Sequence, residues 1–311
     1  MKQSKKDIPK YKNLEAGIVV IENYKIKKEI NQDFIFQAAS ISKILTAICV
    51  MKLVEKRKLD LNKDVNNYLK DWKIINKKGK EEKITLKELL SHTAGINCSG
   101  FVGYKQNKKI PSLMQILKGQ KPANNNLIYF KHKKGKYRYS GGGYEIIQKL
   151  IEDITSKSFE IIVKNYLFKP LKMKDSSFSK PKKFIKGYEK NKQVNKDCFI
   201  YPEKAAAGLW TTSEDLAKLL IELQLSYIGK SNKILSKKST KIMLKPITFA
   251  ERNFISLGFF ISKNKKKFYH TGHNRGYRSK FSMDFKGNGI IILTNNGEGN
   301  ILINRLMEKN K

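Results

Sequence analysis

Arginine and acidic side chains are scarce in this sequence of 311 residues. Six of its 64 basic residues are arginine, 27 residues are acidic, and the formal net charge is +37. Arginine is the residue that proteins prefer for reading phosphates and bases, and no nucleic-acid-binding module accompanies the charge, so a nucleic-acid partner is not expected. Because the lysines are spread along the whole chain, we interpret most of the charge as a solvated surface, with an anionic partner as the alternative.

Long apolar runs and cysteines are also rare. No run of about eighteen apolar residues exists, so no transmembrane segment is predicted. No apolar segment follows the basic N-terminus, so a secretory signal is not seen, and a cytoplasmic location is expected if the chain is complete. The three cysteines, Cys49, Cys98 and Cys198, lie too far apart for a disulfide framework or a zinc site, and no metal is expected.

The remaining composition is that of a globular protein. Hydrophobic residues make up 40% of the chain and aromatic residues 10%. A chain of this length can bury a large core, as one big domain or as two lobes.

A serine and a lysine stand three residues apart in Ser40-Ile41-Ser42-Lys43, at the start of a helix predicted over residues 41–57. Side chains at this spacing lie on the same face of a helix, so the two can meet. A serine hydroxyl becomes a good nucleophile when a neighbouring base takes its proton, which an uncharged lysine can do. In a lysine-rich chain the same tetrapeptide also arises by chance, so it does not identify a site alone.

Further motifs follow the tetrapeptide in a fixed order. They are LLSHTAGI at residues 89–96, YRYSGGGY at 137–144 and HTGHNRGY at 270–277. Two longer stretches accompany them, LDLNKDVNNYL at 59–69 and AAAGLWTTSEDL at 205–216. Chance does not explain an ordered set of this kind.

Together these motifs resemble the serine β-lactamase-like superfamily, on the side of class C β-lactamases, D-alanyl-D-alanine carboxypeptidases and related esterases. That superfamily shows S-x-x-K, then Y-x-N or Y-S-G, then K-T-G or H-x-G. The resemblance extends from about Phe36 to the C-terminal end. It implies an α/β fold, with an antiparallel sheet flanked by helices, an inserted all-helical lobe, and an active site in the cleft between them.

Tyr139 has two interpretations. A tyrosine before a glycine-rich turn often anchors the loop. The resemblance implies instead that Tyr139 shares proton transfer with Lys43. The position that usually holds asparagine is Gly141 here, a form that esterase- and peptidase-like relatives tolerate and dedicated β-lactamases usually lack.

The segment from His270 is predicted to be a strand that lines the cleft. On its own it is an ordinary strand end. By resemblance, His270, Thr271 and Gly272 replace K-T-G, the edge along which a substrate extends. The resemblance also implies that the backbone amides of Ser40 and His273 form the oxyanion hole. Histidine in place of lysine removes a fixed charge opposite a substrate carboxylate, which Arg275 or Arg278 would supply instead.

His92 is a histidine close to these motifs that we leave outside the catalytic set. Within LLSHTAGI it resembles a structural turn element and not a general base.

The order of predicted elements supports a two-lobed organisation. Strand patterns occur near both ends of the chain, and helical patterns alternate with loops between them. We therefore predict an α/β lobe from residues 1–61 and 205–311 and a helical lobe from residues 62–204.

The sequence thus predicts a serine hydrolase that forms an acyl-enzyme on Ser40, helped by Lys43 and Tyr139. Its substrate would be a small molecule or a peptide with an ester or amide bond, including D-amino-acid peptides, peptidoglycan-derived peptides or β-lactams. No metal or organic cofactor is required. The alternative is a degenerate relative that binds peptide or cell-wall ligands without turnover. Members of the superfamily are often periplasmic or secreted.

Overall fold

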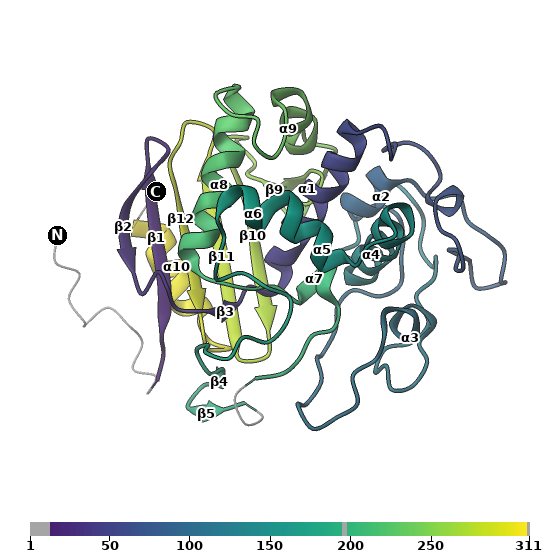
Figure 1. The fold of residues 1–311 in the computed structure, drawn as a ribbon, viewed down its shortest axis with the longest axis horizontal. Coiled ribbons are helices and arrows are strands. Elements are labelled where there is room, and N and C mark those ends of the chain that lie inside the picture. The colour runs from purple at the N-terminus through teal and green to yellow at the C-terminus, as the bar shows by residue number, and fades with distance from the viewer. Residues whose placement is uncertain (1–12, 195–197, 310–311) are drawn as a thin grey trace.

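The computed structural model describes residues 13–194 and 198–309. Its largest feature is an eight-stranded antiparallel sheet with the order β2-β1-β12-β11-β10-β9-β8-β7 (Figure 1). The strands are β1 (Ala16–Glu22), β2 (Lys25–Ile30), β7 (Thr248–Ala250), β8 (Asn253–Ile255), β9 (Phe260–Ile261), β10 (Lys267–Asn274), β11 (Tyr277–Asp284) and β12 (Gly289–Thr294). They come from both ends of the chain, which confirms the predicted α/β fold with an antiparallel sheet.

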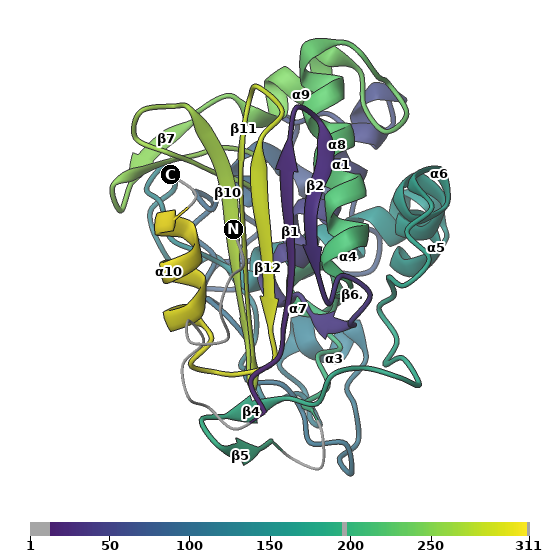
Figure 2. The ribbon, with the colours of Figure 1, turned by 90° about the vertical axis from the view of Figure 1, so that its left-hand side faces the viewer.

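Both faces of the sheet are covered by helices. Successive residues of β12 point to opposite faces. Ile291 belongs to the main core, whereas Ile290 and Ile292 belong to a second cluster beneath α10 (Asn300–Lys309). On the other face, α8 (Ser213–Ile228) packs against the sheet (Figure 2).

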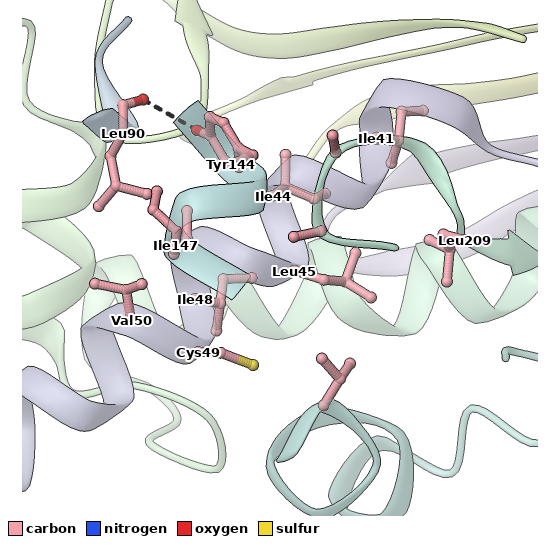
Figure 3. Close-up of a cluster of buried hydrophobic side chains, with 14 of the residues drawn as sticks. Ile41, Ile44, Leu45, Ile48, Cys49, Val50, Leu90, Tyr144, Ile147 and Leu209 are labelled. Carbon is pink, nitrogen blue, oxygen red and sulfur yellow. Dashed lines mark hydrogen bonds between the residues drawn. The ribbon is translucent and has the colours of Figure 1, made fainter. Parts of the chain in front are cut away.

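The helix behind the nucleophile, α1 (Ser42–Glu55), lies at the centre of the main core. Every residue from Ser42 to Met51 is buried, so the helix is enclosed on all sides and not along one face only. Apolar side chains of α1 and α4 pack together here, and the Tyr144 hydroxyl donates to the Leu90 carbonyl oxygen at 3.0 Å (Figure 3). A helix that is apolar all round belongs in such an interior.

Four helices predicted in the middle of the chain are present. They are α2 (Leu86–Leu90), α3 (Leu113–Lys118), α4 (Gly141–Thr155) and α5 (Phe159–Val163). The last continues through a π-helical turn, η4 (Lys164–Phe168), into α6 (Lys169–Leu171). Capping boxes at Thr85 and Ser112 fix where α2 and α3 begin.

The middle segment is not entirely helical, however. A short hairpin, β4 (Tyr188–Glu189) and β5 (Lys192–Gln193), lies within residues 62–204. Its strands are two residues long and polar, so no alternating pattern marks them in the sequence. The division into lobes at residues 61/62 and 204/205 stays a prediction.

Several short elements escaped the sequence analysis. They are β3 (Phe36–Gln37), η3 (Val65–Asn67), α7 (Lys204–Ala207), β6 (Trp210–Thr211) and α9 (Lys237–Leu244). The pairing of β3 with β6 joins the chain just before the nucleophile to the chain just before α8. The N-cap of α8 is Thr212, whose hydroxyl accepts from the Asp215 amide at 3.1 Å. No described helix is long and apolar enough to cross a membrane.

Candidate active site

Ser40 lies in a short 3₁₀ turn, η2 (Ala39–Ile41), that leads directly into α1. The φ angle of Ala39 is 51°, in the left-handed region that residues other than glycine rarely occupy. Such strain persists only where the surroundings hold it. The Ser42 hydroxyl donates to the Ala39 carbonyl oxygen at 2.6 Å and accepts from the Leu209 amide at 3.0 Å. These two bonds brace the turn that presents Ser40.

The Lys43 side chain lies in the first turn of α1, is only 2% exposed and reaches back to Ser40. Its Nζ donates to the Ser40 Oγ at 3.1 Å and to the Ala206 carbonyl oxygen at 2.7 Å. Two aromatic rings enclose the same nitrogen, with centroids at 5.0 Å for Tyr139 and 5.5 Å for Tyr144. Lys43 is therefore placed to exchange a proton with Ser40.

Tyr139 lies beside this serine–lysine pair, just before α4 begins. The next residue, Ser140, is the N-cap of α4, and its hydroxyl oxygen accepts from the Gly143 amide at 3.0 Å and donates to the Cys98 carbonyl oxygen at 2.7 Å. Within residues 13–194 and 198–309, the Tyr139 hydroxyl forms no hydrogen bond, and Tyr139 lines the same cavity as Ser40. The Tyr139 phenol is thus available to hydrogen-bond with a substrate in the cavity.

His92 supports Tyr139 from behind. Its ring packs on the Tyr139 ring at a centroid distance of 4.4 Å, and its Nδ1 accepts from the Ser140 amide at 3.1 Å. Burial, followed by the charge of Lys43, lowers the pKa of His92 well below its ordinary value, so the ring is neutral. These contacts are those of a structural residue.

One edge of β10 is open where it passes the nucleophile, because β9 pairs only with its first half. Asn274 and Tyr277 close the two-residue turn into β11 and must exchange hydrogen bonds with each other. Since bonded and non-bonded pairs alternate along an antiparallel ladder, the N–H of His273 points away from β11, toward the open edge.

Gly272 lets β10 approach the nucleophile turn. A Cβ atom at this position would lie 2.3 Å from the Ala38 carbonyl oxygen, 2.2 Å from the Ser279 Oγ and 3.1 Å from the Ala39 Cβ. Only glycine fits such a close contact. The contact brings the amide of the next residue, His273, to the turn that carries Ser40, as a two-amide oxyanion hole requires.

A cavity of about 610 Å³ opens over these groups. Seven of the residues predicted for the site line it: Ser40, Lys43, Tyr139, Gly141, Thr271, Gly272 and His273. Its other walls include Phe101, Tyr137, Ala206, Ala207, Glu251, Phe260, Asn274, Arg278 and Lys280.

His270 does not line this cavity, although the sequence suggested that it binds substrate. Alternate residues of β10 point into the core, and His270 is 2% exposed. Its Nδ1 lies 2.7 Å from the Thr271 carbonyl oxygen. Burial and the charge of Lys43 lower the pKa of His270 to about 3, so its ring is neutral. The structure places His270 behind the serine–lysine pair.

Arg275 also lies outside the cavity lining. It occupies the turn between β10 and β11, where its guanidinium packs over the Phe199 ring at 4.8 Å from the centroid. Arg278, the alternative to Arg275, does line the cavity, and its Nε donates to the Gly297 carbonyl oxygen at 2.7 Å. Of the two arginines, Arg278 is therefore the one that can face a substrate anion.

Asn274 is a cavity residue that the sequence analysis did not select. Its Nδ2 donates to the Gln37 Oε1 at 2.8 Å and to the Ala207 carbonyl oxygen at 3.1 Å, which ties β10 to α7. Because Asn274 lies two residues after Gly272, the two residues lie on the same face of the strand, and this spacing was visible in the sequence.

Other reactive groups near the site offer no competing chemistry. The described part of the chain contains no group of three or more His, Cys, Asp or Glu side chains arranged to hold a metal ion. The three cysteines form no disulfide. Burial raises the pKa of Cys98 to about 11, so its thiol is a poor nucleophile at neutral pH.

Comparisons with known proteins agree with this geometry. A family model described as Beta-lactamase matches residues 11–305. Protein flp of Staphylococcus aureus strain N315 is 28% identical over 272 residues, which are 84% of this chain and 52% of flp. The chain thus spans about half the length of the first curated relatives that it matches. Teichoic acid D-alanine hydrolase of S. aureus strain MRSA252 is 26% identical over 94% of this chain and 75% of the relative.

Solved structures show the same fold. A penicillin-binding protein from Bacillus halodurans superposes with a TM-score of 0.75 at 19% identity, covering 97% of this chain and 96% of that one. The D-amino acid amidase of Ochrobactrum anthropi SV3, complexed with L-phenylalanine amide, superposes with a TM-score of 0.74 at 18% identity, covering 94% of this chain and 92% of the amidase.

Proposed function

Because the chain belongs to the beta-lactamase family, we propose that it is a serine hydrolase that cleaves ester and amide bonds through an acyl-enzyme on Ser40. The observation that supports this most directly is the 3.1 Å hydrogen bond between the Lys43 Nζ and the Ser40 Oγ in an open cavity. A buried lysine amine in contact with a serine hydroxyl is the arrangement that general-base activation needs.

Acylation begins when the uncharged Lys43 amine takes the Ser40 proton and the Oγ attacks the substrate carbonyl carbon. The negative charge that develops on the carbonyl oxygen is held by the amides of Ser40 and His273, a contribution that is often the largest single one in acyl transfer. When the tetrahedral intermediate collapses, the leaving group receives a proton from Lys43 or through the Tyr139 phenol. The acyl group then remains on Ser40 as an ester.

Deacylation uses the same groups with water as the nucleophile. The Lys43 amine and the Tyr139 phenol flank the ester and can take a proton from the attacking water. Water adds to the acyl carbon, the bond to the Ser40 Oγ breaks, and the oxygen regains its proton. Every step uses residues of this chain.

For the substrate, we propose small acyl esters and D-amino-acyl esters and amides, ahead of β-lactams. Gly141 offers no side-chain amide to an acylamino group, and His270 offers no cation to a carboxylate. Glu251 is a carboxylate that lines the cavity and can pair with an α-ammonium group. The similarity to a teichoic acid D-alanine hydrolase and to a D-amino acid amidase supports the same class of substrate.

A covalent serine probe tests the proposal. A fluorophosphonate should add mass to the one peptide that contains Ser40, and Ser40→Ala should abolish the addition. Ser99→Ala is the matched control and should keep the labelling. Ser99 lines the same cavity, but in the described part of the chain its hydroxyl forms no hydrogen bond with a lysine amine. Parent protein with an unmodified Ser40 after long exposure would contradict the proposal and favour ligand binding without turnover.

A further inference from the structure

The short helix α7 connects a buried carboxyl group to the catalytic lysine. The Ala206 carbonyl oxygen accepts a hydrogen bond from the Lys43 Nζ at 2.7 Å, and the Ala206 amide donates one to the Glu145 Oε1 at 3.0 Å. Glu145 lies on α4 and is fully buried. A continuous chain of contacts therefore runs from Glu145 through Ala206 and Lys43 to Ser40.

A second buried acid stands beside the first. Glu203 immediately precedes α7 and, like Glu145, is 0% exposed. In the described part of the chain, both carboxyl oxygens of Glu203 and the Oε2 of Glu145 are buried without a hydrogen-bond partner. Burying an unpaired carboxylate is costly, so such groups take up a proton instead.

Burial is the largest influence on the protonation of the pair. It raises the pKa of Glu145 well above its ordinary value, and an ionised Glu203 raises it further, whereas the hydrogen bond from the Ala206 amide and the charge of Lys43 lower it. Burial raises the pKa of Glu203 to about 8. Both side chains are therefore neutral near pH 7, and one of them ionises as the pH rises above that region.

We propose that Glu145 is a positioning residue that aims the Lys43 amine at Ser40 through Ala206. The proposal rests on the serine-hydrolase function above, since it assigns a role within the same reaction.

The physical reason lies in the geometry of an uncharged amine, which has two N–H bonds and one lone pair. If the Ala206 carbonyl oxygen holds one N–H, the lone pair is left to face Ser40. The carbonyl oxygen of a neutral Glu145 carboxyl group still accepts a hydrogen bond from the Ala206 amide.

Three buried rings near Lys43, those of His270, His92 and Tyr144, keep one charge state between pH 5 and 9. Burial lowers the pKa of His270 to about 3 and that of His92 well below its ordinary value, and burial raises that of Tyr144. Tyr139 faces the amine with its ring. The carboxyl pair, in contrast, changes its charge within this pH range.

The neighbours of the pair include Cys98, Tyr104 and Tyr201. Burial raises the pKa of the Cys98 thiol to about 11 and those of Tyr104 and Tyr201 to about 12. Glu152 lies two turns further along α4, where its carboxylate accepts from the Phe159 amide at 3.1 Å.

Four variants test the proposal, with the rate of fluorophosphonate labelling at Ser40 measured from pH 5 to 9. Glu145→Gln keeps an acceptor for Ala206 and should label within about twofold of the parent at pH 7, whereas Glu145→Ala should label about tenfold more slowly or worse. Gln148→Ala is the matched control: Gln148 accepts from the Ala205 amide of the same α7 at 3.2 Å, one turn along α4, and its loss should cost less than about threefold.

Rescue by glutamine separates positioning from mere packing, because Glu145→Gln keeps the acceptor for the Ala206 amide and Glu145→Ala does not. In Glu203→Gln, labelling at pH 7 should stay within about twofold of the parent, because Glu203 is already neutral there and its carboxyl oxygens have no hydrogen-bond partner in the described part of the chain. Both glutamine substitutions are nearly isosteric, so they remain informative if Glu145→Ala does not fold.

An amide resonance gives a second measurement that needs no activity. The Ala206 N–H signal in ¹H–¹⁵N spectra should stay downfield in the parent and in Glu145→Gln, and should move upfield in Glu145→Ala. The inference is overturned if Glu145→Ala labels at the parent rate, if Gln148→Ala loses as much as Glu145→Ala, or if Glu145→Gln labels as slowly as Glu145→Ala. A parent that never labels would overturn the serine-hydrolase function, and the Ala206 signal would then decide separately whether Glu145 holds this amide.

Discussion

Gly272→Ala is the substitution whose effect the structure specifies most closely. The new Cβ would lie 2.3 Å from the Ala38 carbonyl oxygen and 2.2 Å from the Ser279 Oγ, whereas real Cβ contacts stay above 3.0 Å. To relieve the backbone contact, β10 must move from the nucleophile turn by about 0.7 Å, the difference between 3.0 and 2.3 Å. A donor about 2.9 Å from the oxyanion would then stand near 3.6 Å, outside hydrogen-bond range.

The loss of one oxyanion donor costs about 10²–10³ in kcat, so Gly272→Ala should lower the kcat for p-nitrophenyl butyrate by that factor. Overpacking should also lower the free energy of unfolding by about 1–3 kcal/mol. The matched control is Gly143→Ala, where the nearest side-chain atom would be the Leu89 Cδ2 at 3.5 Å, an ordinary contact. That variant should keep the parent kcat.

A double variant shows which contact limits how closely β10 can approach the nucleophile turn. Ser279→Ala removes the side-chain contact but leaves the Ala38 carbonyl oxygen in place. Gly272→Ala with Ser279→Ala should therefore recover only part of the lost kcat. Full recovery, or a Gly272→Ala single variant with the parent kcat, would refute the argument that this backbone approach places the His273 amide.

Three further predictions concern the same cavity. Lys43→Ala and Tyr139→Phe should each slow acylation by about 10²–10⁴ while the far-UV circular dichroism stays that of the parent, and parent rates on p-nitrophenyl acetate would contradict the assigned role. The kcat/KM values should rank p-nitrophenyl butyrate above a D-alanyl-D-alanine peptide and that peptide above nitrocefin; nitrocefin as the best substrate would restore a β-lactamase function. Arg278→Gln should raise the KM of carboxylated substrates. Arg275→Gln should leave the KM unchanged, because the Arg275 guanidinium packs on an aromatic ring outside the cavity. Equal effects of the two substitutions would show that the cavity lining does not decide how the carboxylate is recognised.

The sequence was sufficient for the parts of the site that depend on short spacings. The family motifs around Ser40 and Tyr139 mark residues that the fold brings to one cavity. The spacing of Ser40 and Lys43 on one helix predicted their contact, because helical geometry alone brings residues three apart together. The β-lactamase-like fold was predicted from the same motifs and is confirmed.

The sequence was not sufficient where the direction of a side chain depends on the register of the sheet. The alternation along β10 shows that His270 and His273 point to opposite faces, but only the packed sheet shows which face is core. The same holds for Arg275 and Arg278, since the turn position was not evident from the spacing of charges.

Long-range polar contacts were the least predictable feature. Glu145 lies among isoleucines on a predicted helix, and its partner Ala206 is 61 residues away in the chain. No local pattern indicates a buried acid of this kind, because helix periodicity describes apolar side chains and takes an isolated glutamate as solvent-facing.

The burial of α1 from Ser42 to Met51 has a consequence for the lifetime of the catalytic geometry. Backbone amides in the interior of a main core exchange with deuterium only when the whole molecule opens, whereas loops and strand ends exchange through local fluctuations. Lys43 lies in the first turn of this helix and Ser40 in the short turn that leads directly into it, so their separation is tied to the most slowly exchanging part of the protein. The open edge of β10 lacks such protection at the cavity. Heat or denaturant should thus disturb the oxyanion side of the site well before it separates the serine from its lysine.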